Sequence, residues 1–150
     1  MSVAISPVGE ADLAELLPLV RAYCDFYSVD PRDDELVALA RALIADPEHE
    51  GVQLIARGES GEPLGFATLY WTWQTLTASR AGVMNDLFVS PEARGNGVGR
   101  ALIEECRRRA REHGAAEVVW ETTPENEASQ RLYDSITSDK SPWVYYALKT

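Results

Sequence analysis

Apolar positions recur along the chain with two different periods, which mark where strands and helices are expected. Short runs of apolar, aromatic and β-branched residues bounded by turn residues indicate strands. The turn Gly58–Gly61 separates two of these runs, so the three central strands are expected to form an antiparallel meander. The predicted strands are Val3–Val8, Val52–Arg57, Leu64–Thr75, Ser79–Val89, Val118–Trp120 and Trp143–Leu148.

Apolar residues spaced three and four positions apart indicate helices between these strands. Pro18 falls inside the first helix and is expected to kink it, and Asp30–Pro31 is expected to cap the second. The resulting order, β-α-α-β-β-β-α-β-α-β, predicts one α/β domain over residues 1–150 with a mixed sheet. The predicted helices are Leu13–Tyr27, Leu36–Ile44 with a stop at Asp46–Pro47, one from Val98 that stops at Gly114, and one from Thr123–Pro124 through Tyr133.

Composition and charge narrow the classes of partner. Lys and Arg number 14 against 24 Asp and Glu, which gives a net charge of −10. This charge disfavours nucleic acid and anionic membranes as partners. Since no transmembrane segment or signal peptide is evident, a cytoplasmic protein is expected. Cys24 and Cys106 are expected to be buried free thiols, and no metal site is expected because His49 and His113 lack ligand partners at suitable spacing.

The clearest chemical signal is the glycine-rich stretch between the strand that ends at Val89 and the helix that starts at Val98. Helix N-termini present unpaired amides that bind phosphates, and glycines let a ligand approach the backbone. Neither a GxGxxG nor a Walker pattern fits, which leaves Arg94-x-x-Gly97-x-Gly99. This pattern predicts a phosphate site to which Arg94 and Arg100 add charge; a ligand-free turn is the alternative.

The stretch resembles the acetyl-CoA signature of the GNAT superfamily of N-acetyltransferases, Arg/Gln-x-x-Gly-x-Gly/Ala. Asp86–Arg94 and Asn126–Tyr133 also resemble the family, and the order of segments matches its topology over nearly the whole chain. The resemblance implies a GNAT-type fold, with a mostly antiparallel mixed sheet flanked by about four helices, and acetyl-CoA as cosubstrate. Within the family, the chain is most similar to the branch that acetylates histone tails and polyamines.

The resemblance also implies where the coenzyme lies. The strand that ends at Val89 would splay from the Val118 strand, and the pantetheine arm would pair there with backbone groups of Leu87 and Val89. Backbone amides from Arg94 to Arg100 would hold the diphosphate. The expected coenzyme-binding residues are Leu87, Phe88, Val89, Arg94, Gly95, Asn96, Gly97, Val98, Gly99, Arg100, Asn126 and Tyr133.

The same residues suggest a mechanism of direct attack by an amine in a ternary complex. Asn126 and Tyr133 are seven apart on a predicted helix and so face one side; Tyr133 is expected to donate to the leaving thiolate. An alkylammonium has a pKa of about 10.4, so a base is needed. Asp86 is the first candidate and Glu121 the second. A backbone N–H near Leu87 or Phe88 is expected to stabilise the oxyanion.

Aromatic and acidic residues near the first two helices suit a cationic acceptor, such as a polyamine-like molecule or a basic peptide. One face of the Leu64–Thr75 strand is expected to line the acceptor pocket, either that of Trp71 and Trp73 or that of Tyr70 and Thr72. A homodimer is expected from the family, and a non-catalytic acetyl-CoA-binding module is the alternative function. The expected acceptor residues are Tyr23, Phe26, Tyr27, Asp30, Trp71 and Asp86.

Overall fold

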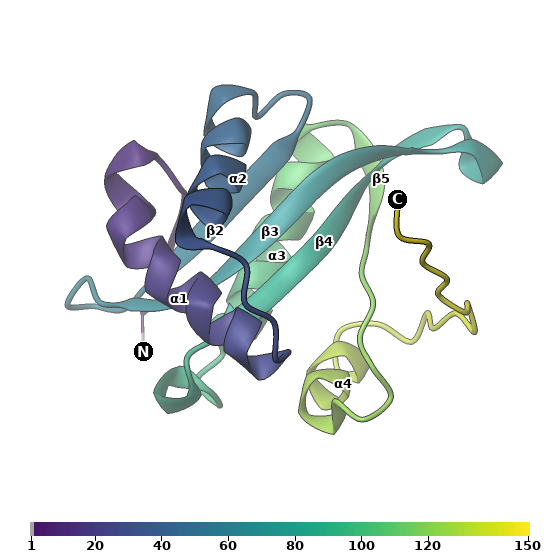
Figure 1. The fold of residues 1–150 in the computed structure, drawn as a ribbon. Helices are drawn as coiled ribbons and strands as arrows, with labels where there is room; N and C mark the ends of the chain where they lie inside the picture. Colours follow the sequence, from purple (N-terminus) through teal and green to yellow (C-terminus); the bar gives the residue numbers. More distant parts are fainter. Residues whose placement is uncertain (1) are drawn as a thin grey trace.

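A computed structural model describes residues 2–150 and contains one mixed sheet with helices on both faces (Figure 1). The five strands follow the order β1-β2-β3-β4-β5, and only β5 runs parallel to its neighbour. Helices α1 and α2 cover one face and α3 covers the other. The elements are β1 Ala4–Pro7, α1 Leu13–Phe26, α2 Asp33–Ala45, β2 Gly51–Arg57, β3 Pro63–Gln74, β4 Ser79–Val89, α3 Val98–Glu112, β5 Ala115–Val119 and α4 Glu127–Asp134, with short 3-10 turns at Glu10–Asp12, Thr75–Thr77 and Pro91–Ala93.

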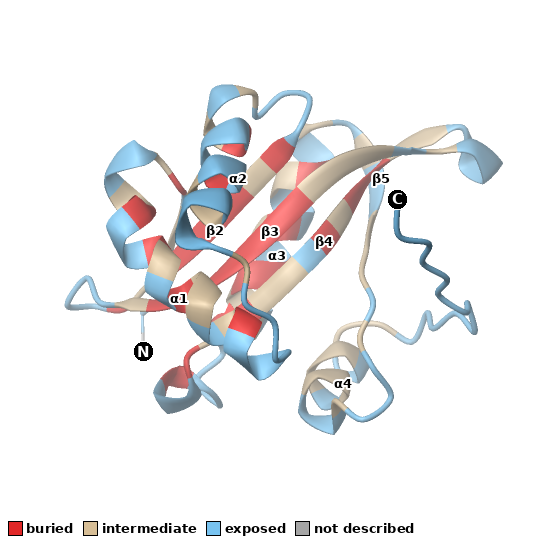
Figure 2. Ribbon diagram, in the orientation of Figure 1, coloured by how far each residue is buried: buried red, intermediate tan, exposed pale blue. Residues whose placement is uncertain are grey.

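The sheet separates two apolar layers, as alternation along its strands requires. Figure 2 shows the buried positions concentrated on the central strands. On the α3 face, Leu54 and Leu69 pack against Leu102 and Cys106 of the helix. On the α1/α2 face the main packing residues are Leu16, Leu19, Ala40, Ile55, Phe66 and Phe88.

Most predicted elements are confirmed, with small shifts in their bounds. Pro18 lies within α1, which is one helix from Leu13 to Phe26. The predicted Asp30–Pro31 cap is wrong, because α2 begins at Asp33. There the carboxylate of Glu35 accepts a hydrogen bond from the Arg32 amide at 3.0 Å. A side chain in the first turn thus accepts a hydrogen bond from a free amide at the start of the helix. Because the sequence pattern favoured Asp30–Pro31 as the cap, it did not predict this hydrogen bond.

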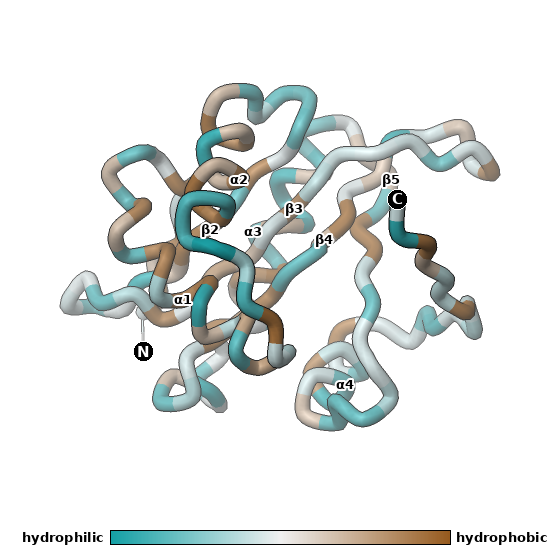
Figure 3. Tube along the Cα trace, in the orientation of Figure 1, coloured by the Kyte–Doolittle hydropathy of each residue, from teal (hydrophilic) through white to brown (hydrophobic). Residues whose placement is uncertain are grey.

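The second half of the chain departs further from the prediction. β5 ends at Val119 and begins at Ala115, directly after Gly114, whose φ of +81° ends α3. The last predicted strand is wrong, since residues 135–150 contain no helix or strand. Its large side chains are exposed, and Figures 2 and 3 show a surface segment that carries hydrophobic positions. Alternation identifies a segment that suits a strand, but a strand also needs a paired neighbour.

Candidate active site

β4 and β5 separate halfway along β4, and this separation creates the predicted opening. Their pairs run only from Arg80–Ala115 to Val83–Val119. Beyond Val83, β4 continues to Val89 and keeps its other edge paired to β3. The half of β4 that follows the last pair therefore presents an edge to which β5 does not bond.

The ladder between β3 and β4 determines which backbone groups face this opening. The Ser90 amide donates to the Leu64 carbonyl at 2.8 Å. In an antiparallel pair, alternate residues bond to the partner strand. Phe88 therefore also points its backbone groups toward β3, whereas those of Leu87 and Val89 point away from it. Of the two predicted oxyanion donors, the geometry favours the Leu87 amide.

The loop before α3 has the open, amide-rich shape that phosphate binding needs. Gly95 and Gly97 have φ of +78° and +82°, and a Cβ on either would meet nothing within 4 Å. Gly97 is the N-cap of α3, and no side chain caps that end. Within residues 2–150, the amides from Gly95 to Arg100 donate to no other group. These free amides and the helix dipole suit an anion.

The side chains of the loop support its shape instead of extending over it. Arg94 Nε donates to the Val89 carbonyl at 3.0 Å and so ties the loop to the end of β4. Asn96 Nδ2 contacts the carbonyls of Ala93 and Arg94 at 3.4 and 3.3 Å. Arg100 donates to Ser135 Oγ at 2.7 Å, which joins the start of α3 to the end of α4. The phosphate-binding capacity of the loop thus lies mainly in its backbone.

Gly99 serves packing between helices. A Cβ on Gly99 would lie 3.0 Å from Leu132 Cδ2 of α4 and 3.7 Å from a methyl of Val89. The missing side chain therefore lets α4 approach the first turn of α3 closely. This contact places α4, with Tyr133, beside the proposed coenzyme loop.

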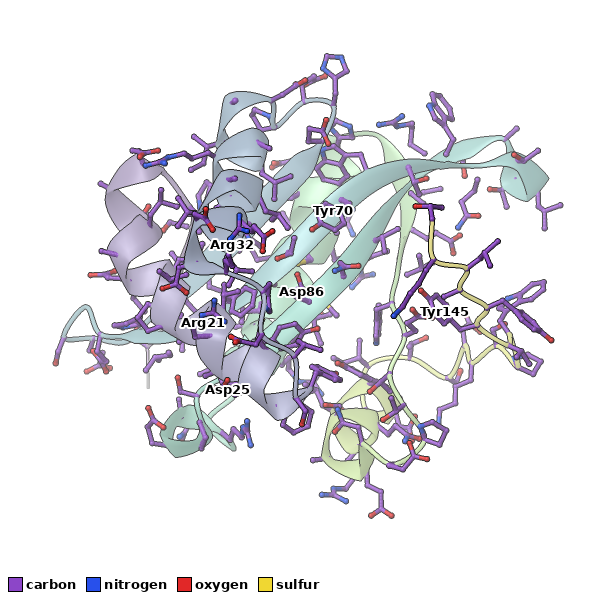
Figure 4. The ribbon with its side chains drawn as sticks, viewed as in Figure 1. Arg21, Asp25, Arg32, Tyr70, Asp86 and Tyr145 are labelled. Carbon is purple, nitrogen blue, oxygen red and sulfur yellow. The ribbon has the colours of Figure 1, made fainter. Side chains whose placement is uncertain are left out.

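Asp86 lies on the α1/α2 face at an irregularity of β4. Thr68 pairs with Asp86 but its neighbour Leu69 pairs with Met84, so Asn85 is an extra residue. The bulge places Met84 against the α3 core while Phe88 packs on the opposite face. Figure 4 shows Asp86 on β4 with Tyr70 of β3 near it, on the face where α1 lies.

Burial raises the pKa of Asp86 above its ordinary value, and the hydroxyls of Thr68 and Tyr23 act in the opposite direction. Asn85 Nδ2 also donates to Asp86 Oδ1 at 3.0 Å. A carboxylate with a raised pKa is a better base than an exposed one. Glu121, the second predicted base, is exposed in the segment that follows β5. The environment therefore favours Asp86 for this role.

Three tyrosines, of which Tyr23 and Tyr27 belong to the end of α1 and Tyr133 to α4, interact electrostatically. Burial raises the pKa values of Tyr23 and Tyr133, and neighbouring phenols contribute, with Tyr27 close to both. The Asp86 charge also raises the pKa of Tyr23. Tyr23 packs edge-on against Tyr27, with ring centroids 5.1 Å apart. The structure thus brings together four predicted site residues: Tyr23, Tyr27, Asp86 and Tyr133.

Tyr133 and Asn126 occupy different parts of α4. Tyr133 packs edge-on against Trp120, whose ring centroid is 5.5 Å away, so the residue after β5 helps to orient it. The prediction that Asn126 lies within the helix is wrong, because α4 begins at Glu127 and Asn126 is its N-cap. Asn126 Oδ1 accepts from the Ser129 amide at 3.3 Å, which leaves its Nδ2 for a ligand.

Three predicted acceptor residues do not join this group. Trp71 stacks on His113 at 4.0 Å, on the α3 face of the sheet, so the alternative face with Tyr70 is the one beside Asp86. The Asp30 side chain is 97% exposed and paired with Arg21 at 3.0 Å. Phe26 is 57% exposed and contacts Tyr27 at the end of α1. Asp30 and Phe26 therefore lie at the surface, and Trp71 lies on the opposite face of the sheet.

Sequence reasoning assigned no role in the site to Gln53, Thr68 or Trp120. Gln53 and Thr68 are buried polar residues in otherwise apolar strands. A polar residue at an inward position of an alternating strand was the only sign of these residues in the sequence. Its importance could be recognised only from the strand register, which pairs Thr68 with Asp86.

Among residues 2–150, no group of three or more His, Cys, Asp or Glu side chains is placed to hold a metal ion. No helix in this range is long and apolar enough to cross a membrane.

Comparison with known proteins identifies the family of this chain. Residues 13–136 match the model of the acetyltransferase (GNAT) family. The chain belongs to the GNAT acetyltransferase family. It is 32% identical over 139 residues to YhfO, an uncharacterized N-acetyltransferase of Bacillus subtilis, covering 92% of this chain and 91% of that protein. The D-amino-acid N-acetyltransferase HPA3 of Saccharomyces cerevisiae is 38% identical over 87 residues, which cover 58% of this chain and 54% of HPA3.

Solved structures of the GNAT family share the fold over the full chain. A probable acetyltransferase superposes with a TM-score of 0.83 at 26% identity, covering 100% of this chain and 98% of that one. AAC(6')-Iy, in complex with the bisubstrate analogue CoA-S-monomethyl-acetylneamine, superposes with a TM-score of 0.84 at 22% identity, covering 100% of this chain and 99% of that one. The predicted GNAT fold and an acetyl-CoA-dependent acyltransferase activity are thus confirmed at the level of the family.

Proposed function

We propose that this GNAT protein transfers an acetyl group from acetyl-CoA to the primary amine of a small molecule, by direct attack in a ternary complex. The observation that carries the proposal is the convergence of Asp86, Tyr23, Tyr27 and Tyr133 beside the free edge of β4. An acceptor that enters between α1 and α4 would meet a partly buried carboxylate and several phenols. Such a site combines a base with donors for the leaving group.

The coenzyme is proposed to lie along the free half of β4, with its diphosphate on the loop before α3. The unpaired amides from Gly95 to Arg100 are the proposed donors to the diphosphate. The outward backbone groups of Leu87 and Val89 are proposed to pair with the pantetheine amides. Asn126 Nδ2 and the Tyr133 hydroxyl, at the two ends of α4, complete the proposed contacts. The coenzyme supplies the thioester that reacts.

The proposed chemistry assigns one proton transfer to each side of the site. Deprotonating an alkylammonium at pH 7 costs about 4.6 kcal/mol, and removal from water together with Asp86 as base reduces that cost. The amine nitrogen then forms a bond to the thioester carbonyl carbon, and the Leu87 amide stabilises the oxyanion. The carbon–sulfur bond breaks while Tyr133 donates its proton to the departing thiolate, and the second proton of the nitrogen passes to the Tyr133 oxygen, which leaves a neutral amide and a neutral phenol.

Ion pairs limit the kind of acceptor that the site is proposed to take. Arg21 contacts Asp30 and Asp33 at 3.0 and 2.6 Å. Arg32 contacts Asp34 and Glu35 at 2.9 and 3.6 Å. The two guanidinium groups offset half of the charge of these four carboxylates, so the cluster attracts a polycation less than the sequence suggested. We therefore propose a small acceptor whose single ammonium group is bound near Asp86.

An acceptor panel with a thiol-release readout tests the function. The panel includes simple primary amines, polyamines, a basic peptide and D-amino acids, the last because of the similarity to HPA3. We expect turnover with at least one small primary amine and a loss of at least tenfold in kcat for Asp86→Asn. Tight acetyl-CoA binding without turnover on any amine would instead support the non-catalytic module.

A further inference from the structure

A row of polar side chains crosses the middle of the sheet behind the proposed base. The register pairs Gln53 of β2 with Thr68 of β3, and Thr68 with Asp86 of β4. Thr68 is completely buried and Gln53 is 6% exposed. The next row on the same face is apolar and consists of Ile55, Phe66 and Phe88.

The hydrogen bond between Gln53 and Thr68 has a defined direction. Gln53 Nε2 donates to Thr68 Oγ1 at 3.2 Å. Because the amide occupies a lone pair of this oxygen, the Thr68 proton is left for Asp86, whose ionised carboxylate only accepts. Since the register sets Thr68 directly opposite Asp86 on the same face of the sheet, the amide of Gln53 orients the Thr68 hydroxyl beside this carboxylate.

The row is unfavourable for stability in one respect. Gln53 Oε1 is buried and, within the described residues 2–150, has no hydrogen-bond partner. Burying an amide oxygen without a partner destabilises the folded state. An apolar side chain of similar length at this position would avoid that penalty. Packing alone therefore does not account for a glutamine here.

We propose that Thr68, held in place by Gln53, is a positioning residue that orients the Asp86 carboxylate and keeps it ionised for catalysis. This inference rests on the proposed function, in which Asp86 accepts the proton of the acceptor ammonium. Tyr23 and Cys24 of α1 and Tyr70 of β3 are the titratable groups that interact with Asp86. The groups that stabilise its charge are hydroxyls and an amide, not Lys or Arg. Losing the Thr68 donor would therefore favour the protonated acid, which cannot act as a base.

The first test needs no acceptor. The side-chain carboxyl ¹³C shift of Asp86, assigned with Asp86→Asn, is titrated in the wild type and in Thr68→Val. We expect Thr68→Val to move the titration midpoint upward by about 1 pH unit, and Thr68→Ser to restore it. Thr72→Val, four residues further along β3 on the same face, is the matched control and is expected to leave the midpoint unchanged. Equal midpoints in wild type and Thr68→Val would overturn the proposal.

A second variant separates positioning from packing. Gln53→Met removes the amide donor together with the unpartnered oxygen and keeps the length of the side chain. We expect a melting temperature equal to or above that of the wild type, and an Asp86 midpoint that moves in the same direction as in Thr68→Val, by a smaller amount. An unmoved midpoint in this folded variant would show that Gln53 only fills space.

Once an acceptor is known, the acid limb of the kcat/KM pH profile of each variant should follow the Asp86 titration midpoint of that variant. The two possible failures are distinguishable. Wild-type kcat in Asp86→Asn refutes the base itself, whatever the titrations show. An inactive Asp86→Asn together with unmoved midpoints in Thr68→Val and Gln53→Met refutes only the positioning row.

Discussion

Alanine at Gly97 tests whether the loop before α3 binds the coenzyme through its backbone. Gly97 has a φ of +82°, and a Cβ there would meet nothing within 4 Å. The substitution therefore introduces no clash, and its effect on stability comes from the left-handed backbone, at about 1–2 kcal/mol. For a chain of 150 residues, this corresponds to a melting temperature lower by roughly 2–8 °C.

Gly114 offers a matched control at the other end of α3. Its φ is +81°, and a Cβ there also meets nothing within 4 Å. Gly114→Ala should therefore lower the melting temperature by the same amount as Gly97→Ala. The 15-residue helix between the two glycines is about 22 Å long, so Gly114 lies far from the loop.

The two variants should differ in coenzyme binding. A methyl group at residue 97 lies on the open surface proposed for the diphosphate and disturbs amides whose charge-assisted hydrogen bonds contribute about 1.5–3 kcal/mol each. Titration calorimetry with CoA should therefore show a Kd at least tenfold higher for Gly97→Ala and a wild-type Kd for Gly114→Ala. Wild-type affinity in Gly97→Ala, or an equal loss in both variants, would refute the backbone site.

Three further predictions concern other parts of the molecule. Tyr133→Phe should lower kcat at least tenfold with little change in CoA affinity, because the hydroxyl is proposed to act only when the thiolate leaves; unchanged turnover would remove it from the mechanism. Asp86→Asn should have a higher melting temperature than the wild type at pH 7, because burial raises the pKa of Asp86 in the folded state. The stability of the wild type therefore falls as the pH rises through that pKa, and the difference in melting temperature between the two proteins should shrink toward pH 4. A chain that ends at Pro142 should melt within about 2 °C of the full chain, since the removed side chains are exposed; a large loss would mean that the segment pairs in the sheet.

Features of the site that depend on residues close together in the sequence were predictable. The glycines at positions 95 and 97 precede a helix that begins at Val98 and ends just before Gly114, as predicted. A left-handed backbone and an amphipathic helix both arise from short-range preferences, so a short stretch of chain specifies them. The family resemblance then assigned Tyr133 to the coenzyme site.

Some features that depend on pairing between distant segments were not predictable. Alternation showed that Tyr70 and Trp71 lie on opposite faces of β3, but not which face carries the site. The residue that stacks on Trp71 is His113, 42 positions further along the chain and known only from the structure. The C-terminal segment suits a strand by composition, yet nothing in its own sequence specifies a partner.

One irregularity in β4 accounts for several properties of the site together. The last pair between β4 and β5 is Val83–Val119, and the extra residue Asn85 follows two positions later. Bulges increase the local twist and disrupt pairing, so this residue explains why β4 leaves β5 at that point. It also lets Met84 remain in the α3 core while Asp86 lies over the opposite face. A strand with strict alternation would place both residues on one face. The opening for the coenzyme and the orientation of the proposed base therefore share one structural cause.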